Sequence, residues 1–533
     1  MEIALQSVNA SKYAWQDISH EIMLKETLND PTATFYPTAE LVIIDPTYEQ
    51  RAVNFRLAYK FNIYVIEPLT NQEIYIDAHT GEILSTQELI RSCNDIPASG
   101  HTNYYNTVDF TVCYEDGSYV LQNNLGGGLQ VFDANNTSQR EETLFTDTDS
   151  IFTEDSTKTA VEVLWAMENT YRYFDSIHDV SCLDADCLPI SSWVHYEQNL
   201  NNAYYVRGLR TLLFGDGDGV TRTSYTSIDI VGHEMTHFLI ENTAALRYRG
   251  ESGALNESFA DIFGEMIERY ALTLNDWIVG ADIFIISDIL GLRNLGNPQD
   301  PAMASQQPHT YQGNLWFDIS PDCDDENDNC GVHTNSGVHN FWFHTLAEGG
   351  SGQNDSGLSY NVSGVGIDTA AAIAFRNLTV YLTPNSGYAD ARTGAIQAAI
   401  DLYGINDPIV TQTAEAWNAV GVFSDRIVDS LALVALYNST NGANWTNPWN
   451  LSQPMDTWYG VTVRNGRVVC LDLDGVTIDE DVDDMVVTPE NSAVFEDITE
   501  ETHSLLIYNR WGNKVFQVMN PPIGFTWDGT YQR

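Results

Sequence analysis

The sequence predicts an α+β protein made of several domains, and three observations lead to this fold class. The chain has 533 residues, more than one ordinary domain holds, and 43% of them are hydrophobic. Strand-like runs bounded by turn residues lie at 55–67 and 73–84, and apolar residues recur at helical spacing in 255–270 and within 370–420. We therefore expect a small α+β domain, a β-rich lobe, a mainly helical lobe, and β-rich modules at the C-terminus.

The first predicted element is the N-terminal α+β domain. Its two strand-like runs are separated by turn residues, and Ala-His-Thr-Gly-Glu at 78–82 is typical of a tight turn. A further domain follows after about residue 98, and the composition changes again after about 424.

The segment 233–237, His-Glu-Met-Thr-His, predicts a metal-binding helix. Residues four apart share one face of a helix, so His233 and His237 can both offer a ring nitrogen to one metal ion. Glu234 then lies beside the remaining coordination position. Catalytic zinc takes three protein ligands and leaves a position for water, so this pattern indicates a hydrolase that needs one more ligand.

Glu257 is the strongest candidate for the third ligand. Glu241 competes with it, but Glu241 lies one turn beyond His237 on the same helix. A third histidine ten residues after the first would indicate a different zinc arrangement, and that position is Thr243.

Residues 255–270 predict a second helix with an acidic edge. Its apolar positions repeat at helical spacing: Leu255, Phe259, Ile262, Phe263, Met266, Ile267 and Tyr270. The other stripe carries Glu257, Asp261, Glu265 and Glu268. These carboxylates are either a solvated face or a zinc ligand with its supporting groups and a calcium site.

With these motifs in place, the chain resembles the thermolysin family of zinc metalloproteases over about 98–423. The resemblance extends to Asn-Asn-Ala-Tyr-Tyr at 201–205, Tyr248, Arg293, and the block 328–337 around His333. It implies two lobes, a β-rich one at 98–245 that includes the zinc helix and a helical one at 246–423, with the zinc helix at their junction. Apolar spacing at 370–375, 393–403 and 413–420 agrees with the helical lobe.

The resemblance also implies roles for individual residues around one zinc ion. Glu234 would remove the proton of water and pass it to the leaving amine, while His333 and Tyr248 would donate hydrogen bonds to the oxyanion. The supporting groups would be Asp261 behind His233, Asn256 near His237, and Asp328 behind His333. Asn202 and Ala203 would hold the substrate as an added strand, and Arg293 would bind a carbonyl on the leaving-group side.

One calcium ion and a hydrophobic pocket are further implications of the resemblance. The calcium positions are Asp229, Glu265, Glu268 and Asp276, whereas Ile278 and Ala281 stand where relatives with a double site carry acidic residues. The pocket after the scissile bond would be formed by Ile230, Val279, Ile283 and Leu292, all apolar. The loop 215–219 looks calcium-like, but a tight turn is favoured.

Charge and cysteine content restrict the partners and the compartment. Lys and Arg number 24 against 74 acidic residues, a formal charge of −50, which disfavours nucleic acid and anionic membranes as partners. No apolar run is long enough to span a membrane. The favoured disulfides are Cys182 with Cys187 and Cys323 with Cys330, Cys93 with Cys113 is a further candidate pair, and Cys470 is left over.

The two ends of the chain resemble modules of exported proteins. Residues 1–97 resemble a PepSY propeptide domain, which implies a role as chaperone and inhibitor of the protease. Residues 424–480 resemble the cap that opens bacterial leucine-rich repeats, and 481–533 resemble a truncated C-terminal sorting domain of type IX secretion. The resemblance to a sorting domain implies export, so we expect a secreted or cell-surface protein, and we expect it to be a monomer. Because the start lacks a signal-peptide pattern, we expect that the signal is missing from this sequence.

Two functions remain from different classes. The favoured one is a secreted zinc endopeptidase acting on proteins and peptides, because every catalytic position carries the expected residue. The other is a surface-binding protein whose protease domain is inactive and whose C-terminal modules provide adhesion.

Overall fold

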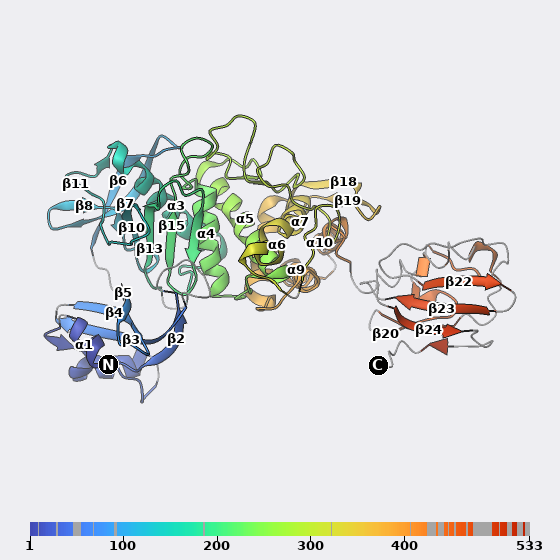
Figure 1. Ribbon diagram of the computed structural model, residues 1–533, viewed down its shortest axis with the longest axis horizontal. Coiled ribbons are helices and arrows are strands. Elements are labelled where there is room, and N and C mark those ends of the chain that lie inside the picture. The colour runs from blue at the N-terminus through green and yellow to red at the C-terminus, as the bar shows by residue number, and fades with distance from the viewer. Residues whose placement is uncertain are drawn as a thin grey trace. The chain divides into compact units, whose positions relative to one another are not determined.

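The computed structural model describes residues 1–423 except 9, 28–29, 46–54, 68, 90–92, 185–186, 321 and 406. Beyond 423 it describes 433–434, 437, 442–464 without 446, 452 and 454, and strands within 467–527. The chain divides into two compact units, Met1–Gly421 and Val422–Arg533. Figure 1 shows that the first unit contains both strands and helices, in agreement with the predicted α+β class.

The N-terminal domain is a twisted antiparallel sheet with helices α1 (Glu2–Ser7) and α2 (Ile18–Thr27). Its strands are β1 (Lys12–Tyr13), β2 (Glu40–Ile44), β3 (Arg56–Glu67), β4 (Leu69–Asp77) and β5 (Ile83–Glu88), in the order β1-β3-β4-β5 with β2 also beside β3. Alternate residues of β3 point inward, so Phe61, Ile63 and Val65 form a core with Ile74 and Ile76 of β4. The predicted turn at 78–82 joins β4 to β5.

The following lobe contains two five-stranded sheets and helix α3 (Lys158–His178). One sheet has the order β14-β15-β13-β10-β9 and the other β11-β8-β7-β6-β12. Their bounds are β6 (Asn94–His101), β7 (Thr107–Glu115), β8 (Ser118–Val120), β9 (Gln122–Asn123), β10 (Leu129–Thr137), β11 (Thr146–Asp147), β12 (Ile151–Phe152), β13 (Ile190–Tyr196), β14 (Ala203–Val206) and β15 (Thr211–Phe214). Strand β14 therefore forms the edge of its sheet.

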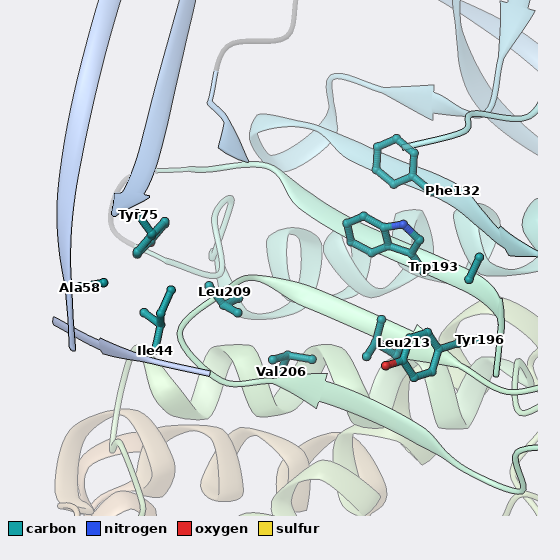
Figure 2. Packing of buried hydrophobic residues seen from close by; sticks show 10 residues of the cluster. Ile44, Ala58, Tyr75, Phe132, Trp193, Tyr196, Val206, Leu209 and Leu213 are labelled. Atoms are coloured by element: carbon teal, nitrogen blue, oxygen red, sulfur yellow. The ribbon is translucent and has the colours of Figure 1, made fainter. Parts of the chain in front are cut away.

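The N-terminal domain packs against the first of these sheets. Ile44 and Tyr75 share a hydrophobic cluster with Leu209 and Val206, and Figure 2 shows them facing one another across the contact. Arg210 Nη2 donates to Glu73 Oε2 at 3.0 Å and to Gln87 Oε1 at 3.2 Å, and Gln87 Nε2 donates to the Leu209 carbonyl at 2.9 Å. The contact thus combines apolar burial with a polar clamp.

The zinc helix predicted at the end of the first lobe is α4 (Ile228–Glu241). The second lobe is built from helices, as predicted. They are α5 (Gly250–Leu272), α6 (Asp328–Asn335), α7 (Gly337–Glu348), α8 (Ile367–Arg376), α9 (Tyr388–Tyr403) and α10 (Pro408–Ala419). Small strands accompany them: β16 (Ile278–Val279) pairs with β17 (Arg293–Asn294), and β18 (Gly349–Gln353) with β19 (Ser359–Ser363). Helices α4 and α5 lie side by side where the strand-rich and helical parts meet (Figure 1).

Glycines explain why α4 and α5 come so close. A Cβ atom on Gly264 would lie 2.5 Å from the Asp229 carbonyl oxygen, and one on Gly232 would lie 2.9 Å from Ile267. Any larger side chain would push the helices apart. The predicted apolar stripe of α5 is buried except at Tyr270, which is 38% exposed. Its acidic stripe is buried as well, so the solvated-face interpretation is wrong.

Three disulfides join Cys93 to Cys113, Cys182 to Cys187, and Cys323 to Cys330. The two favoured pairings and the further candidate are therefore confirmed. None of the described helices is long and apolar enough to cross a membrane.

The second unit is rich in strands. One sheet joins β20 (Val461–Arg464), β21 (Arg467–Asp472) and β25 (Thr526–Trp527), and another joins β22 (Ala493–Thr499), β23 (Thr502–Tyr508) and β24 (Lys514–Met519). Aromatic residues Tyr437, Trp445, Trp449 and Trp458 form a small core. Much of the segments resembling the repeat cap and the sorting domain, including 424–432, 438–441, 473–492 and 509–513, lies outside the described residues.

Candidate active site

Helices α4 and α5 bring His233, His237 and Glu257 together, as the motif predicts. The Nε2 atoms of the two histidines lie 3.0 Å apart, and each lies 3.5 Å from an oxygen of the Glu257 carboxylate. Glu257 is 1% exposed, and its Oε2 atom has no hydrogen-bond partner. Two imidazole nitrogens and a buried carboxylate that converge in this way suit a zinc ion, so the residues fit the metal.

The groups behind the histidines set the direction of their Nε2 atoms. His233 Nδ1 lies 2.9 Å from Asp261 Oδ1, and His237 Nδ1 lies 2.7 Å from Asn256 Oδ1. Asp261 is also bound by Arg293, at 2.6 and 2.9 Å, and by the amide of Asn340 at 2.8 Å. Sequence reasoning missed Asn340, because it lies 79 residues after Asp261 and no local motif marks it.

Burial and neighbouring charge shift the pKa values of these ligands in different directions. Burial lowers the pKa of both histidines, but the Asp261 and Glu257 carboxylates outweigh it at His233 and raise its pKa to about 10. The pKa of His237 stays lowered, at about 4. Burial opposes ionisation of Glu257, yet the surrounding histidines hold its pKa well below the usual range.

Glu234, Tyr248 and His333 surround this cluster. Burial raises the pKa of Glu234, which is 8% exposed, to about 7. The Tyr248 hydroxyl donates to Glu257 Oε1 at 2.5 Å and lies 3.1 Å from His333 Nε2. Burial and the Glu257 charge raise the pKa of Tyr248, so the phenol keeps its proton for donation.

A tight left-handed segment positions His333. Residues 328–331 all have positive φ, between 49° and 73°, and the Cys323–Cys330 disulfide braces them. The Asp328 carboxylate binds the His333 ring at Nδ1 (2.6 Å) and accepts from its backbone N–H at 3.0 Å. Burial lowers the pKa of His333, but the Glu257 and Asp328 carboxylates raise it overall.

A cavity of about 560 Å³ joins these residues to the edge strand β14. Asn202, Ala203, Tyr204 and Tyr205 line it along one side, so the free edge of β14 faces the zinc cluster. An extended peptide can pair with such an edge.

The apolar pocket forms only in part as predicted. Ile230, Val279 and Leu292 line the cavity together with Arg293. Ile283 is completely buried and is not among the residues that line the cavity.

The predicted calcium residues form a second acidic group. Oxygens of Glu265, Glu268 and Asp276 lie within 4.8 Å of one another. Both Glu265 oxygens and Glu268 Oε2 lack hydrogen-bond partners. Asp229 is outside this group of three, and its carboxylate accepts from the Ser227 hydroxyl at 2.5 Å and from the Gly280 N–H at 2.5 Å.

Burial and mutual repulsion raise the pKa of the three carboxyls in this acidic group and that of the neighbouring Asp229. The pKa of Glu268 rises to about 9, that of Asp229 to about 6, and those of Glu265 and Asp276 also rise. Asp282 contributes to the repulsion and was missed by sequence reasoning. A hard cation would remove the repulsion and supply the missing partners, so these residues fit calcium.

Comparison with known proteins finds related proteins over both lobes. The family described as "Thermolysin metallopeptidase, catalytic domain" matches residues 97–241, and "Thermolysin metallopeptidase, alpha-helical domain" matches 244–422. Bacillolysin of Brevibacillus brevis is 34% identical over 428 residues, covering 78% of this chain and 72% of that protein. The thermostable neutral protease NprT of Geobacillus stearothermophilus is 34% identical over 391 residues, covering 69% and 67%.

A third relative, thermolysin of Bacillus sp. strain EA1, is 33% identical over 431 residues, covering 76% of this chain and 73% of that protein. Both lobes and the buried His233, His237 and Glu257 cluster fall within the matched residues. The chain belongs to the thermolysin family of metallopeptidases.

Proposed function

We propose that this chain is an exported zinc endopeptidase in which Glu234 is the general base. The observation that carries the proposal is the convergence of Glu234, Tyr248 and His333 on the cavity that holds the zinc-ligand cluster. His233, His237 and Glu257 would hold one zinc ion per chain. When bound, zinc supplies Lewis acidity that polarises a carbonyl and acidifies water.

The remaining chemistry is assigned to protein side chains. Glu234 accepts a proton from the attacking water and transfers it to the leaving amine. Tyr248 and His333 donate hydrogen bonds to the oxyanion, and Asp328 holds His333 in the donating orientation. Asp261 and Asn256 fix the ring planes of the two histidine ligands.

Substrate would bind as a strand along β14. Asn202 and the Ala203 backbone would pair with the peptide, while Arg293 would bind the carbonyl of the residue after the scissile bond. Ile230, Val279 and Leu292 line the cavity and favour a bulky hydrophobic side chain at that residue, and the buried Ile283 is proposed to support them.

Zinc removal tests the proposed function. Casein hydrolysis by the full chain should stop when 1,10-phenanthroline removes zinc, and it should return when zinc is added back. The full chain without chelator is the reference, measured with zinc per molecule. Casein hydrolysis that continues without zinc would contradict the mechanism, and its absence with zinc bound would favour the binding-protein hypothesis.

We also propose that Asp229, Glu265, Glu268 and Asp276 bind one calcium ion. Without a cation, the buried carboxyls that lack partners weaken the native state. Calcium added at about a thousand times its Kd should stabilise the protein by about 4 kcal/mol.

Thermal unfolding during a calcium titration, with zinc held constant, measures this effect. The matched control is the Glu265→Gln, Glu268→Gln double variant, which should gain no stability from calcium. An unfolding temperature of the parent chain that does not respond to calcium would refute the site.

The N-terminal domain, 1–97, is proposed to act as chaperone and inhibitor. Support for the chaperone role is its apolar and polar contact with the β14-containing sheet. No described residue of 1–89 lines the cavity, so inhibition by direct blockage has less support than the chaperone role. The Glu73→Gln, Gln87→Ala variant loses polar contacts between the two domains, so it should refold in lower yield if the N-terminal domain is a chaperone. It should turn over casein faster if the domain is an inhibitor. Unchanged yield together with unchanged casein turnover would contradict both roles.

Export and oligomeric state complete the proposal. The disulfides suit an oxidising compartment. The resemblance of 481–533 to a sorting domain suggests type IX secretion, and we propose separately that the chain is a monomer. Recovery of the chain inside the producing cells, and not in the medium or on the cell surface, would contradict export. Light scattering would measure the molar mass and so test the monomer.

A further inference from the structure

Three arginines line the cavity, and they differ in their partners. Arg293 is paired with Asp261 at 2.6 Å, and Arg207 with Glu241 at 3.4 Å. Arg222 forms no ion pair with any acidic residue in the part of the chain that the structure describes. In a protein with 74 acidic and 24 basic residues, a cavity arginine without a carboxylate partner needs a specific explanation.

The fold fixes the backbone and stem of Arg222. An isolated antiparallel bridge joins it to Phe284, with backbone hydrogen bonds from Thr223 to Ile283 at 2.8 Å and from Ile285 to Thr221 at 3.0 Å. The guanidinium carbon lies 5.2 Å from the centre of the Phe284 ring. Arg222 Nε is buried and has no hydrogen-bond partner.

The nearest acidic residue in sequence is already engaged elsewhere. The Asp218 carboxylate accepts hydrogen bonds from the backbone N–H groups of Val220, Thr221 and Arg222, from the Thr221 hydroxyl, and from the Asn201 amide. With five donors it holds a tight turn, as favoured for the 215–219 loop, and among the described residues it forms no ion pair with the Arg222 guanidinium. The guanidinium does have a side-chain hydrogen bond with the Tyr225 hydroxyl, which carries no charge to neutralise it.

Arg222 also lies on the leaving-group side of the proposed site. The segment that it pairs with, 283–285, begins four residues after Val279, the last residue of β16. Val279, Ile230 and Leu292 line the same cavity as Arg222 and form the apolar pocket assigned to the residue after the scissile bond. A substrate that fills this pocket would bring its next residue toward the guanidinium.

We propose that Arg222 binds a substrate carboxylate just beyond the hydrophobic residue that follows the scissile bond. A guanidinium offers a planar fork of donors that matches a carboxylate, and the partly enclosed site limits competition from water. The carboxylate is an Asp or Glu side chain, or the terminal carboxylate of a short leaving peptide. This inference rests on the proposed function and specifies its substrate class.

Peptide substrates that differ in one charge test the proposal. The first pair carries Leu after the scissile bond, then Glu or Gln, and continues to an amidated end. The second pair ends at that Gln, with either a free or an amidated carboxyl group. We expect kcat/KM to be about tenfold higher for the charged member of at least one pair, and the pair concerned identifies the source of the carboxylate.

The Arg222→Gln variant should reduce that ratio to about one, and Arg222→Lys should give an intermediate ratio, because lysine keeps the charge but loses the fork. The matched control is Arg376→Gln, which removes a surface arginine outside the cavity and should keep the parent ratio. A parent ratio of one in both pairs, or a ratio that Arg222→Gln leaves unchanged, overturns the proposal.

Binding separates this inference from the proposed function. In the zinc-loaded Glu234→Ala background, fluorescence anisotropy measures Kd for the same labelled peptides without turnover. Tighter binding of the charged peptide that disappears in the Arg222→Gln variant supports the inference even if the parent chain cleaves nothing. Equal Kd values for charged and neutral peptides overturn it even if the parent cleaves casein.

Discussion

Replacing Glu234 with Gln should lower kcat for casein or a model peptide by about 10³-fold, with zinc content unchanged. Gln keeps the size of the side chain but cannot accept the proton of water or return it to the leaving amine. Glu234 is close to the zinc-ligand cluster, yet it is not one of the three residues whose ligand atoms converge. The measurement is turnover together with zinc per molecule on the same preparation.

A ligand variant distinguishes loss of the base from loss of the metal. His233→Ala should lose zinc and activity together, because it removes one of the three converging ligands. If Glu234→Gln retained most of its activity, or lost zinc as His233→Ala does, the assignment of Glu234 as base would be wrong.

Replacing His333 with Ala should lower kcat by about 10² to 10³-fold while zinc stays bound. His333 lies 3.1 Å from the Tyr248 hydroxyl and is held by Asp328, so it can donate to an oxyanion. Since the interaction is made with the transition state, the loss should fall mainly on kcat and not on KM.

Two further variants test the assignment of His333 as a donor to the oxyanion. Asp328→Asn should cause a smaller loss, because the amide still contacts the ring but no longer favours its protonated form. The exposed His79→Ala in the N-terminal domain should leave turnover unchanged. Loss of zinc from His333→Ala would show that this histidine has a different role.

Local sequence pattern was sufficient for features that lie within one helix. The four-residue spacing of His233 and His237 follows from the period of the α-helix, so their shared face could be predicted without tertiary structure. The same period correctly predicted the buried stripe of α5. The close disulfide pairs were also predictable, because short loops keep their ends near one another.

Pattern was insufficient where burial depends on distant segments. The acidic stripe of α5 has the spacing of a solvated face, but packing against α4 buries it. The family resemblance placed Ile283 in a pocket, although this residue is completely buried and does not line the cavity. No local motif marks three further residues whose contacts are with distant parts of the chain. Asn340 donates to Asp261, Asp282 raises the pKa of Glu268, and Arg222 pairs with Phe284.

The sequence by itself determined the α+β class, the metal-binding helix and, through family resemblance, the set of residues proposed for catalysis. Only the tertiary structure decided how these residues meet. Glycine-mediated contact between α4 and α5 brings Glu257 to the histidines, and the left-handed turn at 328–331 brings His333 to Tyr248. The tertiary structure also leaves Arg222 without an ion pair to a carboxylate among the described residues. The physical reason is that helical period acts over a few residues, whereas burial and charge pairing depend on which distant segments share a surface.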